Sequence, residues 1–406
     1  MKKMIKLSLV AAVAVAGLTT SATAGSLENA IKDTTISGKA MVGYNVNEDK
    51  NAAVTANEVE YDFDITLNTK VNDTISFTAG IQADHANETR GVSTDKSEYY
   101  KTWADLATET TTTGNPSTDS ITLTKLYFTA KTDVATVMIG KQKQPTPFLD
   151  DERADGVVAL VPAGPVTIAA GHLTGMNAGY QDVSISAAAV IGTFGPVNAS
   201  LWALDVTNGT TPGSAAVLDS SGDTITAATV DTVFPGADGY SLNLNGTFGP
   251  VNVDLTHSSL ELNGAATEAE TLTKLIVSGK VANVNLVLGY GMTNDTVARN
   301  HGVDLTADDD AKTNFGIDQI RLDNYSDADA ILLGASMTFD KTTVGVNYVM
   351  ASAEKSNVVG ATSDLDADEL DLTVKYAMSK NFSITGLYSN LEADTNTAIM
   401  DETRME

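Results

Sequence analysis

Apolar and polar side chains alternate along residues 239–257. The apolar positions of the first half are Tyr240, Leu242, Leu244 and Phe248. The polar positions between them are Ser241, Asn243, Asn245 and Thr247. Gly249 and Pro250 interrupt the alternation, which then resumes. Because successive side chains of a strand point to opposite faces, this segment predicts an antiparallel hairpin with one apolar and one polar wall, joined by a tight turn.

The same unit of a strand, a compact turn and a second strand recurs along the chain. Further short turns are expected at Lys70–Asp73, Lys131–Asp133, Pro162–Pro165, Phe194–Pro196, Ala282–Asn283, Asp340–Thr342 and Ser379–Asn381. The segment TFGPVN occurs twice, at Thr193–Asn198 and at Thr247–Asn252. Gly, Pro, Asn and Asp are frequent in these segments and favour the backbone angles of turns.

Longer polar connections alternate with the short turns. They are expected at about Asp84–Ser120, Gln144–Asp155, Asn208–Asp238, Asn294–Asp327, Ala353–Asp366 and Asp394–Asp401. Short turns at one end and long loops at the other are typical of a transmembrane antiparallel β-barrel of the outer membrane, whereas a soluble sandwich has no reason to separate them in this way.

The number of segments predicts an all-β barrel of about 18 strands, with about 17 complete strands and another that begins near Asp401. We expect this last strand to be truncated, because an open sheet would leave backbone groups without hydrogen bonds in hydrocarbon. A barrel of this width encloses an aqueous channel.

The first 24 residues have the features of a secretory signal peptide. Lys2, Lys3 and Lys6 precede the apolar run Leu7–Leu18, and Ala22–Ala24 offers a cleavage site. We therefore expect residues 1–24 to be removed and residues 25–406 to form the barrel domain. Ser26–Asp33 predicts a short N-terminal helix. No later stretch is apolar enough to predict a transmembrane helix.

Charge narrows the range of partners. The chain has 52 acidic and 25 basic residues, a formal net charge of −27, and no cysteine. Such acidity argues against nucleic acid as a partner and favours an attraction for cations.

Several short motifs resemble one known family, the major outer membrane porins of Campylobacter-type bacteria. The motifs are Lys6–Ala12, Leu27–Asp33 followed by Ile36–Gly38, Leu126–Thr129, Val134–Thr136, Ile139–Gln142, Asp155–Gly156 and Asn381–Ser383. The resemblance implies an 18-stranded, homotrimeric general diffusion porin that prefers cations. It also implies outer-membrane lipid and lipopolysaccharide as surroundings.

The polar face of the strand expected at Glu58–Asn68 carries an acid at every second position. These acids are Glu58, Glu60, Asp62 and Asp64. On the inside of a barrel they would line the pore and raise the local concentration of cations. The alternative is the solvated face of a strand in a soluble protein. Lysines that could face these acids are Lys125, Lys141, Lys143, Lys274, Lys280 and Lys375.

The connection Gln144–Asp155 is the sequence's candidate for a loop that folds into the channel. Its charged residues are Asp150, Asp151, Glu152, Arg153 and Asp155. Pro145 and Pro147 restrict its entry by fixing φ. If these charges face Lys141 and Lys143 across a constriction, they would create a transverse field. The alternative is an ordinary exposed acidic loop.

Two further acid clusters, Asp308–Asp310 and Asp364–Glu369, could hold Ca²⁺ or Mg²⁺ loosely or bridge these ions to lipopolysaccharide. Neither predicts a dedicated metal site, and no cofactor is expected. No catalytic fingerprint of a hydrolase, a metalloprotease, an NTPase or a dinucleotide-binding enzyme is present.

The sequence thus predicts that the chain is not an enzyme. It predicts a passive porin for small hydrophilic solutes and ions, with cation preference, in the outer membrane of a Gram-negative bacterium. The alternative is a secreted surface-layer or adhesin-like structural β-protein.

Overall fold

The fold is that of a computed structural model, which describes most of the residues beyond position 33. The described residues are 34–49, 54–89, 120–143, 146–147, 153–174, 183–211, 217–218, 224–226, 232–234, 236–263, 269–294, 320, 322, 325–356, 365–395 and 398–405. The signal peptide and the helix expected at Ser26–Asp33 lie outside them. Among the described residues, no helix has the length and apolar character needed to cross a membrane.

One large sheet of 18 strands dominates the structure. Its first half consists of β1 (Thr34–Asp49), β2 (Val54–Lys70), β3 (Ile75–Thr89), β4 (Ser120–Lys131), β5 (Thr136–Lys143), β6 (Arg153–Ala163), β7 (Val166–Thr174), β8 (Ser184–Phe194) and β9 (Val197–Val206). Its second half consists of β14 (Ala237–Phe248), β15 (Val251–Leu262), β16 (Glu270–Val281), β17 (Val284–Thr293), β18 (Tyr325–Phe339), β19 (Thr342–Ser356), β20 (Leu365–Ser379), β21 (Phe382–Thr395) and β22 (Ala398–Met405).

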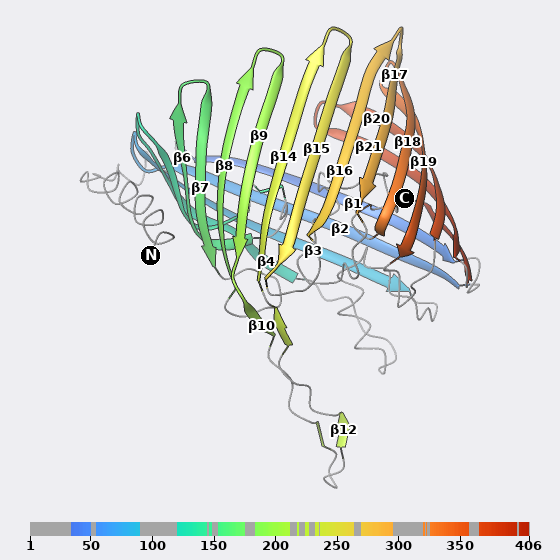
Figure 1. The fold of residues 1–406 in the computed structure, drawn as a ribbon, viewed down its shortest axis with the longest axis horizontal. Coiled ribbons are helices and arrows are strands. Elements are labelled where there is room, and N and C mark those ends of the chain that lie inside the picture. Colours follow the sequence, from blue (N-terminus) through green and yellow to red (C-terminus); the bar gives the residue numbers. More distant parts are fainter. Residues whose placement is uncertain are drawn as a thin grey trace.

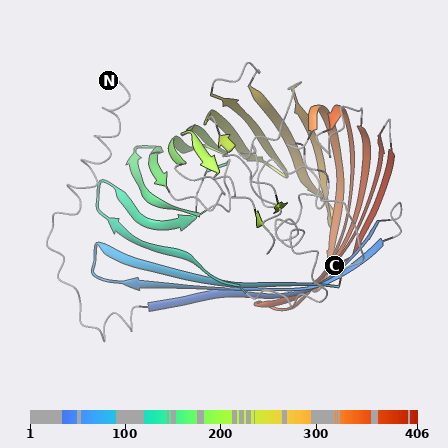
Figure 2. The same ribbon diagram turned by 90° about the horizontal axis from the view of Figure 1, so that it is seen from below.

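The strands form a ring in which each strand pairs antiparallel with its neighbours along the chain (Figures 1 and 2). β9 pairs with β14, and β22 returns to pair with β1 between Val46↔Met405 and Asp49↔Glu402. The transmembrane barrel predicted from the alternating pattern is therefore confirmed. A two-sheet sandwich is excluded, because the 18 strands belong to one sheet.

The expected tight turns all gather at one end of the barrel (Figure 1). Gly164, Gly195 and Gly249 have φ angles of 65°, 62° and 64°, which glycine adopts without steric cost. The repeated TFGPVN segment makes the same contact twice. Thr193 donates to Asn198 Oδ1 at 2.7 Å, and Thr247 donates to Asn252 Oδ1 at 3.1 Å.

The first turn of the barrel is held by its own side chains. Asn72 Oδ1 accepts hydrogen bonds from the backbone N–H groups of Thr74 and Ile75, both at 2.8 Å. Lys70 Nζ lies 2.9 Å from Asp73 Oδ1, and this hydrogen bond lowers the pKa of the Asp73 carboxyl. The turn thus uses Asn and Asp in the way their side chains favour.

The longer connections join the strands at the other end of the barrel. Between β9 and β14 the chain forms two small ribbons, β10 (Gly209–Thr211) with β13 (Thr232–Phe234) and β11 (Val217–Leu218) with β12 (Thr224–Thr226). The loop expected at Asp394–Asp401 was wrong, because β21 continues to Thr395 and β22 begins at Ala398. The closing strand therefore starts earlier than the acidic sequence indicated.

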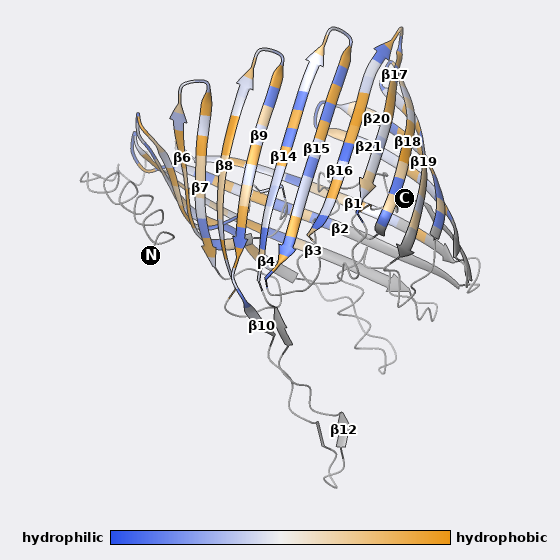
Figure 3. Cartoon of the chain, in the orientation of Figure 1, coloured by the Kyte–Doolittle hydropathy of each residue, from blue (hydrophilic) through white to orange (hydrophobic). Residues whose placement is uncertain are grey.

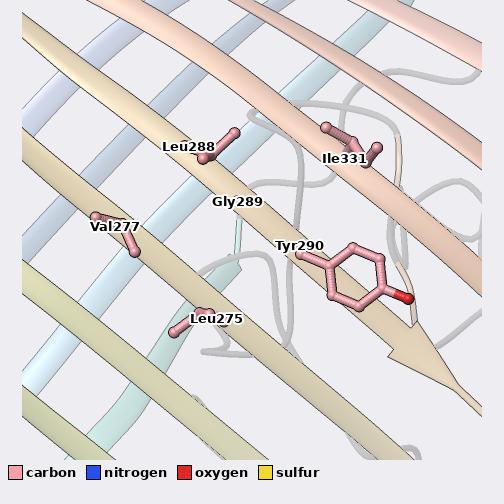
Figure 4. A pocket seen from close by; sticks show the side chains of 6 residues that line it. All are labelled: Leu275, Val277, Leu288, Gly289, Tyr290 and Ile331. Atoms are coloured by element: carbon pink, nitrogen blue, oxygen red, sulfur yellow. The ribbon is translucent and has the colours of Figure 1, made fainter.

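Hydrophobic and hydrophilic residues alternate along many strands of the barrel (Figure 3). Large apolar side chains are widely exposed on the outer face, including Leu201 at 52%, Leu288 at 53% and Val374 at 50%. Leu275, Val277, Leu288, Tyr290 and Ile331 line an apolar groove on this face, across β16, β17 and β18 (Figure 4). So broad an apolar surface is unfavourable on a monomer in water, but it is the surface that an outer-membrane barrel presents to lipid hydrocarbon.

Exposed aromatic side chains lie near both ends of the outer face. Those beside the turns are Phe194, Phe248, Phe339, Tyr376 and Phe382. Those toward the loops are Tyr44, Tyr240, Tyr290 and Tyr348. Two aromatic belts at the interfaces are a feature of outer-membrane barrels, because amphipathic rings favour the headgroup region.

The assignment of faces predicts how two arginine substitutions on β17 will differ. Leu288→Arg places a charge on the exposed apolar face and should lower the free energy of unfolding by about 2–4 kcal/mol, as for a charge near the bilayer midplane. Asn285→Arg, on the opposite face of the same strand, should cost less than about 1 kcal/mol because it meets lumen water. Denaturant unfolding from lipid vesicles measures both. Equal costs would contradict the face assignment.

Candidate functional site

The inner face of β1, β2 and β3 brings acidic and basic side chains into contact. Lys39 Nζ lies 3.3 Å from Asp62 Oδ2. Gln82 Nε2 donates to the other oxygen, Asp62 Oδ1, at 3.3 Å. The Asp62 side chain is only 17% exposed, whereas that of Lys39 is 66% exposed. The carboxylate is therefore held in place on the wall while the ammonium group stays largely in lumen water.

A second polar group lies nearer the turns. Thr66 Oγ1 donates to Asp64 Oδ1 at 3.4 Å, and Lys125 Nζ donates to Thr66 Oγ1 at 3.1 Å. The hydroxyl of Thr66 thus lies between a carboxylate and an ammonium group. Phe63 and Leu67, which alternate with these residues on β2, are exposed on the outer face. The wall of β1–β4 therefore presents both signs of charge to the lumen.

A third carboxylate lies on the opposite side of the ring. β15 is nine strands away from β2 in a ring of 18. Asp254 of β15 accepts hydrogen bonds from Asn243 at 3.2 Å and from Asn245 at 2.9 Å. Asn243 also donates to Thr256 Oγ1 at 2.8 Å. The polar wall of the hairpin at residues 239–257 is therefore a hydrogen-bonded part of the lumen lining.

Toward the loop end the inner face changes character and becomes apolar. We call this region the inner collar; its buried residues are Val158, Leu173, Ile185, Leu204, Leu260, Leu272, Leu332 and Val349. Their strand registers place them inside the ring, yet Leu173, Ile185, Leu272 and Val349 are at most 1% exposed. Other parts of the chain must therefore pack against them inside the barrel.

Two residues of the β17–β18 connection belong to this packing. Ile320 and Leu322 are 1% and 0% exposed and lie in the same apolar cluster as the inner collar. The backbone N–H of Ile320 donates to Glu369 Oε2 on β20. We call these two residues the inner anchor. Sequence reasoning missed them, although the alternation of Ile320 and Leu322 within a polar connection was a usable signal.

The structure describes the side chains of two of the four acids of β2 that were predicted to line the pore. Asp62 and Asp64 lie on the inner face, as does Lys125 of β4. Glu58 and Glu60 continue the alternation within β2, opposite Glu88 and Ala86 of β3. Their side chains lie outside the described part of the chain.

The placement predicted for Lys141 and Lys143 inside the lumen does not agree with the register. Lys141 pairs with Leu126 and with Asp155, and Leu126 is exposed on the outer face. Gln142, between the two lysines, is 4% exposed and faces inward. Because faces alternate, Lys141, Lys143 and Asp155 lie on the outer face near the loop end. Arg153 pairs with Lys143 in the same ladder.

The remaining candidates of the acidic loop, Asp150, Asp151 and Glu152, lie outside the described residues. Thr146, at the start of that connection, is 4% exposed.

The acid cluster at Asp364–Glu369 does not converge on one point. Leu365 begins β20, so Asp366 and Asp368 are exposed on one face while Glu369 is buried on the other. Asp308–Asp310 lie outside the described residues. Within the described part, no group of three or more His, Asp or Glu side chains is arranged to hold a metal ion.

Residues 1–178 match the family model of the Campylobacter major outer membrane protein. This match confirms the resemblance. It extends over β1–β7 and includes the Leu126–Thr129, Ile139–Gln142 and Asp155–Gly156 motifs. A comparison with curated protein sequences found no match.

Solved outer-membrane channels share the fold at low sequence identity. Acinetobacter baumannii OccAB1 has a TM-score of 0.64 at 12% identity, with 95% of this chain and 97% of that chain covered. Pseudomonas aeruginosa OccK2, solved in complex with glucuronate, has a TM-score of 0.62 at 13% identity, covering 92% and 95%. A BenF-like porin from Pseudomonas fluorescens has a TM-score of 0.62 at 11% identity, covering 92% and 97%. The chain is an outer-membrane barrel of the porin type in a Gram-negative bacterium.

Two motifs of the Campylobacter family contain glycines that face each other across the sheet. Gly140 of β5 pairs with Gly156 of β6. A Cβ at Gly140 would lie 2.2 Å from the Leu126 carbonyl oxygen, and one at Gly156 would lie 2.2 Å from the His172 carbonyl oxygen. Gly140 also has a φ of 126°, which other residues rarely adopt. The motifs therefore mark a place where neighbouring backbones approach closely.

This geometry predicts a large cost for Gly140→Ala. Backbone strain and the contact with the Leu126 carbonyl should lower the free energy of unfolding by about 1–3 kcal/mol. Gly164→Ala is the matched control, since its φ is also positive but nothing lies within 4 Å of the added Cβ. Thermal unfolding, followed by the loss of the compact band on unheated gels, compares the two. If Gly140→Ala lowers the stability no more than Gly164→Ala does, the close approach of the backbones at Gly140 does not contribute to the cost of the substitution.

Proposed function

We propose that the chain is a passive diffusion channel for small hydrophilic solutes and ions, with a preference for cations. The observation that carries the preference is the position of Asp62, Asp64 and Asp254 on the inner face, on two opposite sides of the ring. No reaction is catalysed in this proposal. Passage depends on the free cross-section and on the electrostatic potential of the lining.

The fixed carboxylates would act through the potential that they create in lumen water. Each is held by hydrogen bonds from neighbouring side chains, so its charge stays at a fixed place on the wall. Such a wall raises the local concentration of mobile cations and lowers that of anions. Lys39 and Lys125 offset part of this effect locally, and the net charge of −27 for the whole chain is in the same direction as the acids.

The nature of the solutes belongs to the same proposal. OccK2, which shares the fold, was solved in complex with glucuronate, a small hydrophilic molecule. This supports small hydrophilic solutes as the cargo class of the barrel type. Lys125 and Lys39 would let the wall contact an anionic group of a solute even where the overall preference is for cations.

Assembly and surroundings complete the proposal. The family resemblance supports a homotrimer, with outer-membrane lipid and lipopolysaccharide around it. Loose association of Ca²⁺ or Mg²⁺ with exposed acids such as Asp366 and Asp368 would follow from the preference of hard cations for carboxylate oxygens. The proposal requires no bound cofactor and no nucleic acid.

Neutralising the wall acids tests the cation preference. Asp62→Asn combined with Asp64→Asn should reduce the cation-to-anion permeability ratio about two- to fivefold, since unit charges a few ångströms apart in water interact by about 1 kcal/mol. Lys125→Gln should shift the ratio the other way. The reversal potential of a planar bilayer in a salt gradient measures the ratio. Asp366→Asn, an exposed acid outside the lumen, is the control. If the double variant conducts with an unchanged permeability ratio, Asp62 and Asp64 are not the source of the cation preference.

The acidic loop receives a separate test. Joint replacement of Asp150, Asp151 and Glu152 by their amides should lower the same permeability ratio if the loop contributes to the constriction. An unchanged reversal potential would remove these three acids from the selectivity mechanism and leave the β2 wall as its source.

A further inference from the structure

The inner face of β14 and β15 carries a cluster of amide and carboxylate side chains, which we call the Asn–Asp cluster: Asn243, Asn245 and Asp254. The two strands lie side by side with β9 in the ring (Figure 1). Each asparagine donates to one oxygen of Asp254, at 3.2 Å from Asn243 and at 2.9 Å from Asn245. All three residues are half-buried, so the cluster is held in place on the wall and still meets lumen water.

The carboxylate fixes how both amides point. An ionised carboxylate only accepts hydrogen bonds, so the NH2 groups of Asn243 and Asn245 must face Asp254. Their carbonyl oxygens point elsewhere, and neither accepts a hydrogen bond from the residues that the structure describes. Asp254 itself has lone pairs beyond those that the two amides use. The cluster thus offers several fixed acceptors to a solute that carries hydroxyl groups.

An aromatic side chain lies at the edge of this cluster that is nearer the loops. Trp202 of β9 pairs with Ser241 of β14, and its neighbour Leu201 is exposed on the outer face, so Trp202 faces inward. Asn243 follows Ser241 by two residues, and such diagonal neighbours are within reach of an aromatic side chain. Trp202 packs against the inner collar on one side and is half-buried. Part of its surface therefore remains available to a solute.

The charges around the cluster favour a neutral solute over an ion. Lys274 of β16 pairs with Thr256, which makes it a diagonal neighbour of Asp254 on the inner face. The fields of an ammonium group and a carboxylate at this spacing offset each other. Fixed acceptors and a nearby ammonium donor beside an indole ring suit a sugar, because sugar hydroxyls both donate and accept while the C–H face of the ring is apolar.

We propose that the inner face of β9, β14 and β15 is a binding site for a neutral sugar. Trp202 contacts the apolar face of the sugar ring, and Asp254, Asn243 and Asn245 bind its hydroxyls. The hydrogen bonds within the cluster hold the acceptors in place beforehand, which lowers the entropic cost of binding. The site names a solute class for the proposed channel and rests on that function for passage, whereas binding itself does not require it.

Tryptophan fluorescence tests the site without relying on conduction. The chain has two tryptophans, so Trp103→Phe leaves Trp202 as a single reporter. In this background, glucose should change the emission of the full chain in detergent saturably. Glucuronate and glucosamine, charged versions of the same ring, should bind no more tightly than glucose. An emission that does not respond to glucose, or tighter binding of either charged sugar, would overturn the proposal.

A substitution at Asp254 tests the polar half of the site in the same assay. Asp254→Asn should weaken glucose binding about fivefold, because hydrogen bonds to a charged acceptor are stronger than those to a neutral one. Asp366→Asn, at an exposed acid outside the lumen, is the matched control and should leave binding unchanged. Equal affinities of the two variants for glucose would remove Asp254 from the site and contradict the proposal.

Conduction through planar bilayers tests the aromatic half. Glucose should lower the ion current of the parent channel saturably. Trp202→Leu keeps an apolar side chain against the inner collar but removes the ring, so the half-effective glucose concentration should rise about fivefold, as when a tryptophan contact is removed from a binding interface. Tyr127→Leu is the control, since Tyr127 faces inward on β4 between the outward-facing Leu126 and Phe128.

The outcomes separate the sugar site from the channel. A channel that conducts but responds to glucose in neither assay rejects the site and leaves the channel function standing. A protein that forms no channel, yet binds glucose with a change in Trp202 emission, rejects the channel function and leaves the site. An equal response of Trp202→Leu and Tyr127→Leu to glucose would show that the ring of Trp202 does not contact the sugar.

Discussion

The structure depends on one constraint, which is that backbone N–H and C=O groups cannot remain unpaired in hydrocarbon. An antiparallel sheet satisfies this constraint only if it closes on itself. Here each strand from β1 to β22 within the main sheet pairs with its two neighbours in the ring, and β22 reaches β1 through the pairs from Val46↔Met405 to Asp49↔Glu402. Closure removes the free edges of the sheet, and a closed ring of 18 strands has a wide interior.

Closure also divides every strand into two environments. Leu288 and Asn285 lie on the same strand, but one faces lipid and the other faces the interior. Residue polarity therefore alternates with a period of two because successive side chains face lipid and the interior. The alternation is clear wherever these two environments differ in polarity. This is why residues 239–257 predict both the hairpin and the polar ladder around Asp254 from the alternation alone.

The direction of side chains could not be predicted in strands whose two faces have similar polarity. In β5 apolar residues occupy both faces, with Val137 and Ile139 on one and Met138 on the other, so the direction of Lys141 could not be read from the pattern. A bulge opposite Gly80 and Ile81 in β3 also shifts the register of β4, which no count of residues reveals. Turn positions were more predictable, because Gly249 and Asn72 have local conformational reasons to be there.

The inner collar shows that the inner face of the barrel is not polar throughout. A lumen-facing Leu173 or Leu272 exposed to water would lose roughly 1.5–3 kcal/mol relative to a buried one. An apolar patch on the inside of a barrel of 18 strands therefore requires that some connection fold inward and cover it. The β17–β18 connection does so through Ile320 and Leu322. A narrow barrel could bury such an apolar surface across its own axis, whereas in this wide barrel Ile320 and Leu322 supply apolar contacts to it.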